Sequence, residues 1–484
     1  MAKMTREQYL QYKKRKRKQK RILTVLLVVL LVIGFALLIG VYALNTMGLA
    51  IQKYWEKDKG KSPTITATPT VAPVTPTSTP SPSPSPSPSP TPTPTPTPNV
   101  VSMIAVGDNL YDWYLLEDGY NREDGTFDFS HNYDYIKKYV QMADFAVVNQ
   151  ETPIGGDEGY VGDSWEEKYF GNRQMWGSYH GYASFNTPDE VGHELVKAGF
   201  NIITMATNHS SDHGYKAIQK SIEFWRTNYP DVTLLGIHDS VEDQNKISVV
   251  EKYGIRIALL NYTYGLNKKS ATEEAAYSVD ILKEDRVRSD IARAKEMADF
   301  VVVFPHWGEE YAMDELNSTQ KKYTKIFLEC GVDAVVGAHP HIGQTMEWLT
   351  GADGHKMVVY YSLGNFISNF KEADCNVEGM AYLEFYKDEN GCSLREGSMI
   401  PIINHWEYSS EKLGDKGKTK QGKNYRVYAL QDYTEELAKG HGCTKYSNGK
   451  SFSYSRIYKV AEKLWGNYIK IVDWSGAEES NKED

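Results

Sequence analysis

Short apolar runs that recur from residue 103 onward constrain the fold of this chain more than any other feature. Each run is continuously apolar, and that pattern is typical of strands covered on both faces, whereas strands with one wet face alternate. The runs cover residues 103–106, 145–148, 201–206, 255–260, 300–304, 333–336 and 357–361. The sequence therefore predicts sheet strands that are buried between other layers.

Segments of helical period separate several of these runs. They cover residues 188–199, 214–227, 280–298 and 318–331. Two later runs, 380–386 and 398–403, have no helix between them, which favours an antiparallel pair. The alternation predicts an α/β fold of layered, mixed sheets flanked by helices.

The first 99 residues predict a membrane anchor and a linker. Residues 1–21 form a basic tail, with ten Lys or Arg and one Glu, and residues 22–44 contain no charge. Those 23 residues span roughly 35 Å as a helix, enough for a hydrocarbon core of about 30 Å. The basic side predicts a cytoplasmic N-terminus, so we expect a single-pass protein of the cell membrane with its C-terminal domain outside.

Residues 45–99 form the expected linker, which contains 14 of the 20 prolines. Alternating Ser/Thr and Pro favours extended polyproline II, and the segment serves either as a stalk or as a plain tether. We expect one domain over residues 100–405. Residues 406–484 are expected to form a C-terminal extension that ends in a disordered acidic tail.

Net charge argues against nucleic acid as a partner. Beyond the basic tail the chain has 44 basic and 62 acidic residues, a formal charge of −18. A negatively charged substrate would then need a local source of positive charge, which a metal centre provides. The four cysteines have no zinc-site spacing; Cys375 and Cys392 either pair outside the cytoplasm or stay as free thiols.

Polar residues follow most of the predicted strands, and taken one at a time they are ordinary turn, cap or surface residues. Ligands of α/β sheets bind beyond the carboxyl ends of strands, so we expect these side chains to gather at one sheet edge. Carboxylate, amide and imidazole groups without thiolate suit Mn, Fe or Zn, and a bridging carboxylate indicates two ions about 3.5–4 Å apart. The residues are Asp108, Asn149, Glu151, Asn208, His209, His306, His339, His341 and Asn365.

A set of motifs occurs here in a characteristic order. They are "VGDN" (106–109), "NQET" (149–152), "ATNHSSDHG" (206–214), "PHWGEEY" (305–311), "GAHPHIGQ" (337–344) and "YSLGNF" (361–366). Together they resemble the CapA family of bacterial capsule or poly-γ-glutamate biosynthesis proteins over roughly residues 100–405. The fold of that family resembles the calcineurin-like metallophosphoesterases, so the resemblance implies a metallophosphoesterase-like sandwich.

The resemblance also implies a role for each site residue. Asp108 and His341 would hold a first divalent metal ion, Asn208, His306 and His339 a second, and Glu151 would bridge them. His209 would contact the scissile group as the catalytic histidine, with Asn149, Asp212 and Asn365 in support. Leu110 stands where the phosphoesterase motif has a second ligand, a histidine, so the first position has fewer ligands and the number of ions is one or two.

Three functions follow from the resemblance. The first is a surface-anchored component of capsule or poly-γ-glutamate biosynthesis, whose partners are the membrane, the capsule polymer and membrane synthesis or export proteins. The second is an extracellular metal-dependent phosphoesterase or other hydrolase. The third is a polymer-binding or assembly module without turnover, so whether the chain is an enzyme stays open at this point.

Overall fold

The computed structural model describes residues 99–157, 178–413, 418–419, 422–446 and 452–474. The expected basic tail, membrane span (22–44), linker up to residue 98 and acidic tail from residue 475 lie outside these ranges. Within the described residues, no helix has the length and apolar character needed to cross a bilayer.

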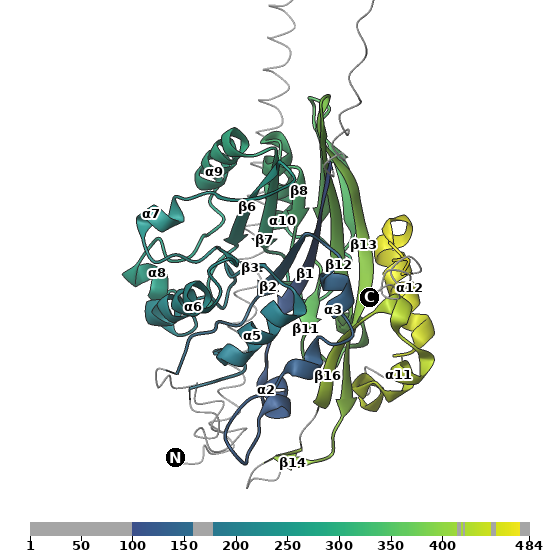
Figure 1. Ribbon diagram of the computed structural model, residues 1–484. Helices are drawn as coiled ribbons and strands as arrows, with labels where there is room; N and C mark the ends of the chain where they lie inside the picture. The colour runs from purple at the N-terminus through teal and green to yellow at the C-terminus, as the bar shows by residue number, and fades with distance from the viewer. Residues whose placement is uncertain (1–98, 158–177, 414–417, 420–421, 447–451, 475–484) are drawn as a thin grey trace, which may run out of the picture. The chain divides into compact units, whose positions relative to one another are not determined.

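The first sheet is mixed, and β1 lies at its centre (Figure 1). β1 (Val100–Asn109) pairs in parallel with β2 (Phe145–Gln150) and antiparallel with β12 (Val377–Asp388). The strand order of this sheet is β16-β13-β12-β1-β2-β3-β4, and β11 pairs with the end of β1. The remaining strands are β3 (Ile202–Thr204), β4 (Thr233–Leu235), β11 (Asn365–Ile367), β13 (Gly391–Tyr408) and β16 (Gly422–Ala429).

The second sheet has the order β5-β6-β7-β8-β10-β9. Its centre is parallel, because β6, β7, β8 and β10 all run the same way, and both edge strands are antiparallel. The strands are β5 (Ser248–Lys252), β6 (Ile255–Thr263), β7 (Phe300–His306), β8 (Ala334–Val336), β9 (Met346–Thr350) and β10 (Lys356–Tyr360).

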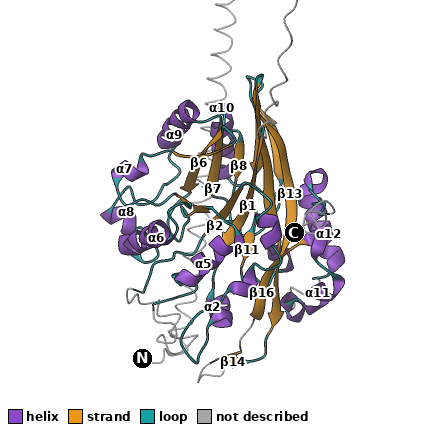
Figure 2. Cartoon of the chain, in the orientation of Figure 1, coloured by secondary structure: helices purple, strands orange, loops and turns teal. Residues whose placement is uncertain are grey.

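Helices cover the sheets on their outer sides (Figure 2). α9 and α10 pack on the second sheet, and α12 lies against β12 of the first sheet. α10 begins at a capping box in which Asn317 and Gln320 each bind the other's backbone N–H. The longer helices are α5 (Asp189–Ala198), α6 (Gly214–Asn228), α9 (Glu284–Met297), α10 (Ser318–Glu329) and α12 (Tyr454–Trp465).

Strand β7 shows why its run is continuously apolar. Val301 and Val303 are buried in one hydrophobic cluster with residues of α9 and α10, whereas Phe300 and Val302 are buried in the other cluster with the first sheet. The Phe300 ring lies 5.0 Å from the ring of Phe385 in β12, so the two sheets face each other there. Both faces of β7 are therefore covered, as the pattern predicts.

The coarse fold prediction is confirmed. All seven apolar runs contain strands, all four periodic segments contain helices, and β12 and β13 form the expected antiparallel pair. The boundary expected at residue 405 falls inside β13, and β16 adds a further strand to the same sheet. The four cysteines are free, with Cys375 buried and Cys392 exposed.

We expect a partly buried histidine after β4 to make the stability of this domain depend on pH. His238 Nε2 lies 2.7 Å from Asp280 Oδ2, and its Nδ1 lies 3.5 Å from Asp243 Oδ2. Burial lowers the pKa of His238, but the two carboxylates outweigh burial and raise it to about 9. A raised pKa stabilises the fold fully below the unfolded value of about 6.5, and this contribution is lost as pH rises through about 9.

We therefore expect His238→Gln to lower the free energy of unfolding at about pH 6 and to have a much smaller effect on it at about pH 9.5. The difference in unfolding free energy between wild type and variant should shrink by roughly 1–3 kcal/mol across that window. Urea unfolding of both proteins at a series of pH values measures it, and groups that titrate in both proteins cancel. A difference that stays constant with pH would contradict the charged state of His238.

Candidate metal centre

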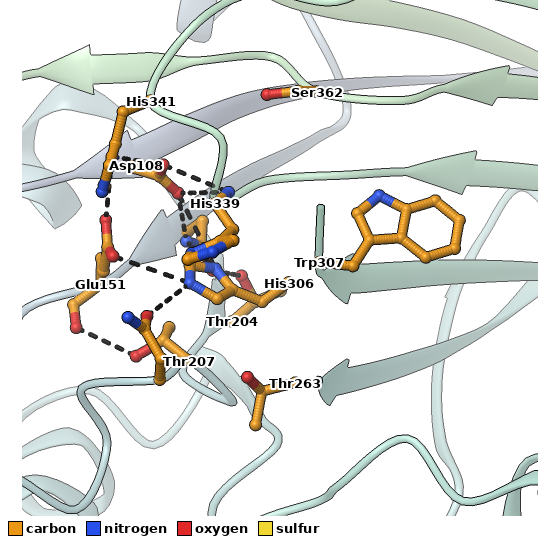
Figure 3. A network of polar contacts seen from close by, with 12 residues as sticks. Asp108, Glu151, Thr204, Thr207, Thr263, His306, Trp307, His339, His341 and Ser362 are labelled. Carbon is orange, nitrogen blue, oxygen red and sulfur yellow. Dashed lines mark hydrogen bonds and ion pairs between the residues drawn. The ribbon is translucent and has the colours of Figure 1, made fainter. Parts of the chain in front are cut away.

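The predicted ligands come together where the two sheets meet at the carboxyl ends of their strands (Figure 3). Asp108 lies near the end of β1, Glu151 follows β2, and His306 ends β7. His339 and His341 lie in the loop after β8. Each of these five residues is at least 95% buried, so their charges are held away from solvent.

These residues form two groups that share one carboxylate. Ligand atoms of Glu151, His306 and His339 all lie within 4.8 Å of one another. Ligand atoms of Asp108, Glu151 and His341 meet the same limit. Glu151 belongs to both groups, which is the position of a bridging ligand between two cations.

The fourth predicted ligand of the second position, Asn208, lies beside His306. His306 Nε2 is 2.8 Å from Asn208 Oδ1 and 3.6 Å from Glu151 Oε1. On the other side, His341 Nδ1 is 3.2 Å from Asp108 Oδ2 and 3.7 Å from Glu151 Oε2. Asn208 is thus next to a member of the Glu151–His306–His339 group, although the assignment of each ligand to an ion stays a prediction.

The chemistry of this cluster fits a divalent cation. Both carboxylate oxygens of Glu151, and Nδ1 of His339, are buried without a hydrogen-bond partner among the described residues. Buried polar atoms are nearly always paired, so such atoms together indicate a ligand. Burial, and then the neighbouring Asp108 carboxylate, raise the pKa of Glu151. A cation between the two carboxylates would offset both effects.

The histidines differ in their electrostatic surroundings. Burial, followed by His341 and His209, lowers the pKa of His339 to about 3, and burial lowers the pKa of His306 as well. Neutral imidazole is the form that binds metal. Burial also lowers the pKa of His341, but Glu151 and Asp108 outweigh it and raise the pKa to about 10.

The loop that holds His339 and His341 has a strained backbone. The φ angles of the two residues are 101° and 56°, in the left-handed region that side chains other than glycine rarely adopt. The backbone N–H of His339 faces both carboxylate oxygens of Asp108 at 3.3 Å. Strain of this kind costs about 1–3 kcal/mol per residue and occurs mostly at functional sites.

The supporting residues contact the ligands directly. Asn149 Nδ2 donates to Asp108 Oδ1 at 2.8 Å, and its oxygen accepts from the Thr204 hydroxyl at 2.9 Å. Asn365 Oδ1 lies 3.0 Å from His341 Nδ1, and its Nδ2 donates to the His341 carbonyl at 2.9 Å. Asn149 therefore orients Asp108, and Asn365 orients His341.

Sequence reasoning missed three residues around the site. The hydroxyl of Thr204 holds Asn149, and the hydroxyl of Thr207 donates to the Glu151 carbonyl at 3.2 Å. Glu378 in β12 is fully buried and accepts from Asn365 Nδ2 at 3.2 Å. Glu378 offered a signal in the sequence, because it is a carboxylate in the mainly apolar first half of β12. Thr204 in β3 and Thr207 in the loop after it offered none.

His209 lies at the edge of the cluster and belongs to neither ligand group. Its Nδ1 is 2.7 Å from Asp212 Oδ2, which also accepts from the backbone N–H of Phe185 at 2.9 Å. Its Nε2 lies 3.4 Å from Asn267 Nδ2. His209, Asn267 and Leu110 all line a cavity of about 660 Å³. Asp212 thus orients His209 at the cavity.

The other polar residues near these motifs lie apart from the ligands. His213 stacks on His180, with ring centroids 5.6 Å apart, and its Nε2 is 3.3 Å from the Ser184 carbonyl. Glu309 and Glu310 are exposed, and no described hydrogen bond joins either to His306. Glu310 lines the cavity.

A glycine allows β1 to deliver Asp108. A Cβ atom at Gly107 would lie 1.9 Å from the Gly364 carbonyl oxygen, which accepts the Asp108 backbone N–H at 2.9 Å. We expect Gly107→Ala to cost about 1–3 kcal/mol of stability and to displace Asp108. Thermal unfolding and metal content measure the two effects.

Gly440→Ala is the matched control, because a Cβ there meets nothing within 4 Å. If Gly107→Ala unfolds and binds metal like Gly440→Ala, the close approach of β1 to Gly364 does not restrict this position.

Comparison with known proteins identifies the family. The profile described as "Bacterial capsule synthesis protein PGA_cap" matches residues 102–370, which is more than half of the chain. The chain belongs to the PGA_cap family. Every residue of the cluster lies within the matched range.

Two relatives are named for capsule or PGA biosynthesis. The capsule biosynthesis protein CapA of Bacillus anthracis is 28% identical over 228 residues, covering 44% of this chain and 53% of that protein. The PGA biosynthesis protein CapA of Bacillus subtilis (strain 168) is 27% identical over 272 residues, covering 56% of this chain and 64% of that protein. The chain thus matches between half and two thirds of the length of these relatives.

Several solved structures resemble the chain weakly. A putative 5′-nucleotidase from Staphylococcus aureus has 14% identity and a TM-score of 0.38, covering 66% of this chain and 56% of that one. The calcineurin-like phosphoesterase YfkN from Bacillus subtilis has 13% identity and a TM-score of 0.33, covering 62% and 90%. GAP50 of Plasmodium has 13% identity and a TM-score of 0.32, covering 78% and 99%. At these TM-scores the superpositions carry no argument about the site of this PGA_cap protein.

Proposed function

We propose that this PGA_cap protein is a divalent-metal hydrolase of phosphoesters that works in capsule synthesis. The observation that carries the proposal is Glu151, which belongs to two ligand groups and whose buried oxygens have no hydrogen-bond partner among the described residues. A carboxylate between two cation positions is typical of sites that act on phosphoesters. The family and its named relatives support capsule synthesis as the setting.

The proposed ligands divide between two positions. Their oxygen and nitrogen atoms, without thiolate, favour Mn, Fe or Zn. When bound, the ions would supply positive charge to the phosphoryl oxygens. Asp108, Glu151 and His341 would hold one ion, and Glu151, Asn208, His306 and His339 the other.

His209 would supply the proton for the leaving group. In hydrolysis a water oxygen bonds to phosphorus and releases a proton to solvent. The bond from phosphorus to the ester oxygen breaks, and the ester oxygen takes a proton from His209. His209 lines the cavity, and Asp212 beside Nδ1 would stabilise the imidazolium that donates this proton from Nε2.

We also propose a fold family and a cellular location for this domain. Two facing sheets with the site at their shared edge support a metallophosphoesterase-like sandwich. The basic tail and apolar run at residues 1–44 support a membrane anchor with the domain outside the cell. We propose the capsule polymer and membrane synthesis or export proteins as partners at that surface.

Leu110 favours a second candidate, a capsule-binding module without turnover. Leu110 is 6% exposed at the cavity, where the phosphoesterase motif has a metal-binding histidine. The metal position formed by Asp108 and His341 would then hold its ion weakly. With only the other ion tightly bound, the site would bind phosphate but would not hydrolyse phosphoesters fast.

Metal analysis and a hydrolase screen of the purified protein decide between the candidates. We expect co-purified or reloaded Mn, Fe or Zn, and phosphate release from phosphoesters that stops with a chelator and returns with metal. Metal binding without turnover of any phosphoester would favour the binding module. A protein that binds no divalent metal would overturn both candidates.

A further inference from the structure

The cavity above the metal centre has the size of a substrate site. Its volume is about 660 Å³, and His209 and His341 are among its lining residues. Pockets of roughly 300–1,000 Å³ are typical of small-molecule sites. A group held at the metal centre would therefore have room beside it for a larger attached unit.

Aromatic rings line this cavity next to His209 and next to His341. The Phe185 ring lies 4.6 Å from the ring of His209, and Tyr182 packs on Phe185 at 6.2 Å. Next to His341, the Phe370 ring lies at 5.2 Å and the Tyr311 ring at 6.2 Å. All four rings line the cavity.

The two tyrosines remain largely exposed although each packs against a phenylalanine ring. Tyr182 is 57% exposed and Tyr311 is 53% exposed. Tyr311 has a φ of 65°, a backbone conformation that is uncommon for a residue with a side chain. Exposed aromatic faces at the opening of a polar site are the usual platform for a ring of the ligand.

The charged groups of the cavity are mainly acidic. Asp112, Glu310 and Glu372 line it, and Lys371 is the one lysine or arginine among its described lining residues. Backbone N–H groups of Trp113 and Tyr182 both bind Oδ1 of Asp112. Carboxylate oxygens only accept hydrogen bonds, so they match a ligand that offers many donors.

We propose that this cavity binds a sugar ring attached to the phosphate, so that the substrate class is a sugar phosphoester. The proposal rests on the proposed phosphoesterase function, because the phosphate would lie at the metal centre. The ring would lie between the aromatic pairs Tyr182–Phe185 and Tyr311–Phe370, and its hydroxyl groups would donate to the carboxylates.

Two other ligand classes fit the cavity less well. A polycarboxylate such as poly-γ-glutamate would place its charges beside three acidic side chains, and like charges in a partly buried site repel. A nucleobase would stack on the rings, but its edge presents several acceptors, which carboxylates cannot satisfy.

Glucose 1-phosphate and glycerol 3-phosphate form a matched pair of probes, because both carry hydroxyl groups and only the first has a ring. With Mn²⁺ present, we expect the kcat/KM of the full-length protein for glucose 1-phosphate to be about tenfold higher than its kcat/KM for glycerol 3-phosphate. Tyr311→Leu and Tyr182→Leu should each reduce this ratio to about threefold or less by raising KM for the sugar ester. Isothermal titration of each probe to protein without Mn²⁺ gives a second readout, in which the sugar ester should also bind more tightly.

Controls separate the ring effect from loss of fold. Tyr311→Phe keeps the aromatic face and should keep the preference for the ring. Tyr458→Leu removes a tyrosine that is 41% exposed and does not line this cavity, so the preference should again persist. Two outcomes would overturn the sugar assignment while leaving the phosphoesterase intact: equal kcat/KM for both probes, or stronger competition by poly-γ-glutamate than by glucose 1-phosphate. Stronger competition by AMP than by ribose 5-phosphate would also overturn it, because the base and not the sugar would then supply the binding. If neither probe is hydrolysed with any divalent metal, the proposed function itself fails.

Discussion

Glu151→Gln should remove nearly all metal binding and all metal-dependent activity, because Glu151 is the one residue in both ligand groups. A ligand that binds only the folded state, and is present at about 100 times its Kd, stabilises the folded state by about 2.7 kcal/mol. For a domain of this size that corresponds to a rise in Tm of about 3 °C, which the variant should lose. Metal content by mass spectrometry and Tm with and without Mn²⁺ or Zn²⁺ measure the effect.

His339→Ala should also lower metal content and activity, but it removes a ligand from one group only. It should therefore keep more metal than Glu151→Gln. Glu309→Gln is the control, because it removes an exposed charge close to the site. This variant should keep the bound metal and the rise in Tm on adding metal. If Glu151→Gln and His339→Ala respond to added metal like wild type, the cluster is not a metal centre.

His209→Ala should keep the metal and its stabilising effect but lose turnover. General acid catalysis contributes typically about 10²–10⁴-fold, so kcat should fall by that factor. Asp212→Asn should give a smaller loss, because His209 stays in place but the carboxylate that favours its charged form is gone. Steady-state kinetics with a phosphoester, together with metal content, test both variants.

His213→Gln is the matched control for the neighbouring histidine, which stacks on His180 and belongs to no ligand group. It should retain turnover. A His209→Ala variant that loses metal together with activity would make His209 a ligand and would contradict its proposed place at the edge of the site.

The grouping of the candidate ligands was predictable, because each of these residues lies at the end of a strand that the sequence indicates by its apolar run. Asp108, Glu151, His306 and His339 all come at or just after continuous apolar runs, and strand ends converge in sheets of this kind. The partners behind the ligands were less accessible. Thr204 and Glu378 become part of the site only through hydrogen bonds to Asn149 and Asn365, and nothing in the local sequence names those contacts.

The sequence by itself determined the buried strands, the helices between them, the order of the motifs and the kinds of ligand available, because burial and ligand chemistry are properties of local residue types. Only the tertiary structure decided that β1 and β2 belong to one sheet and β7 and β8 to another, so that the site lies where two facing sheets meet and not along one edge. It also decided the pairing of Tyr182 with Phe185 and of Tyr311 with Phe370 around the cavity. The two pairs lie more than 120 positions apart in the sequence. Their common place around one cavity follows from the packing of whole sheets and loops, which no local pattern records.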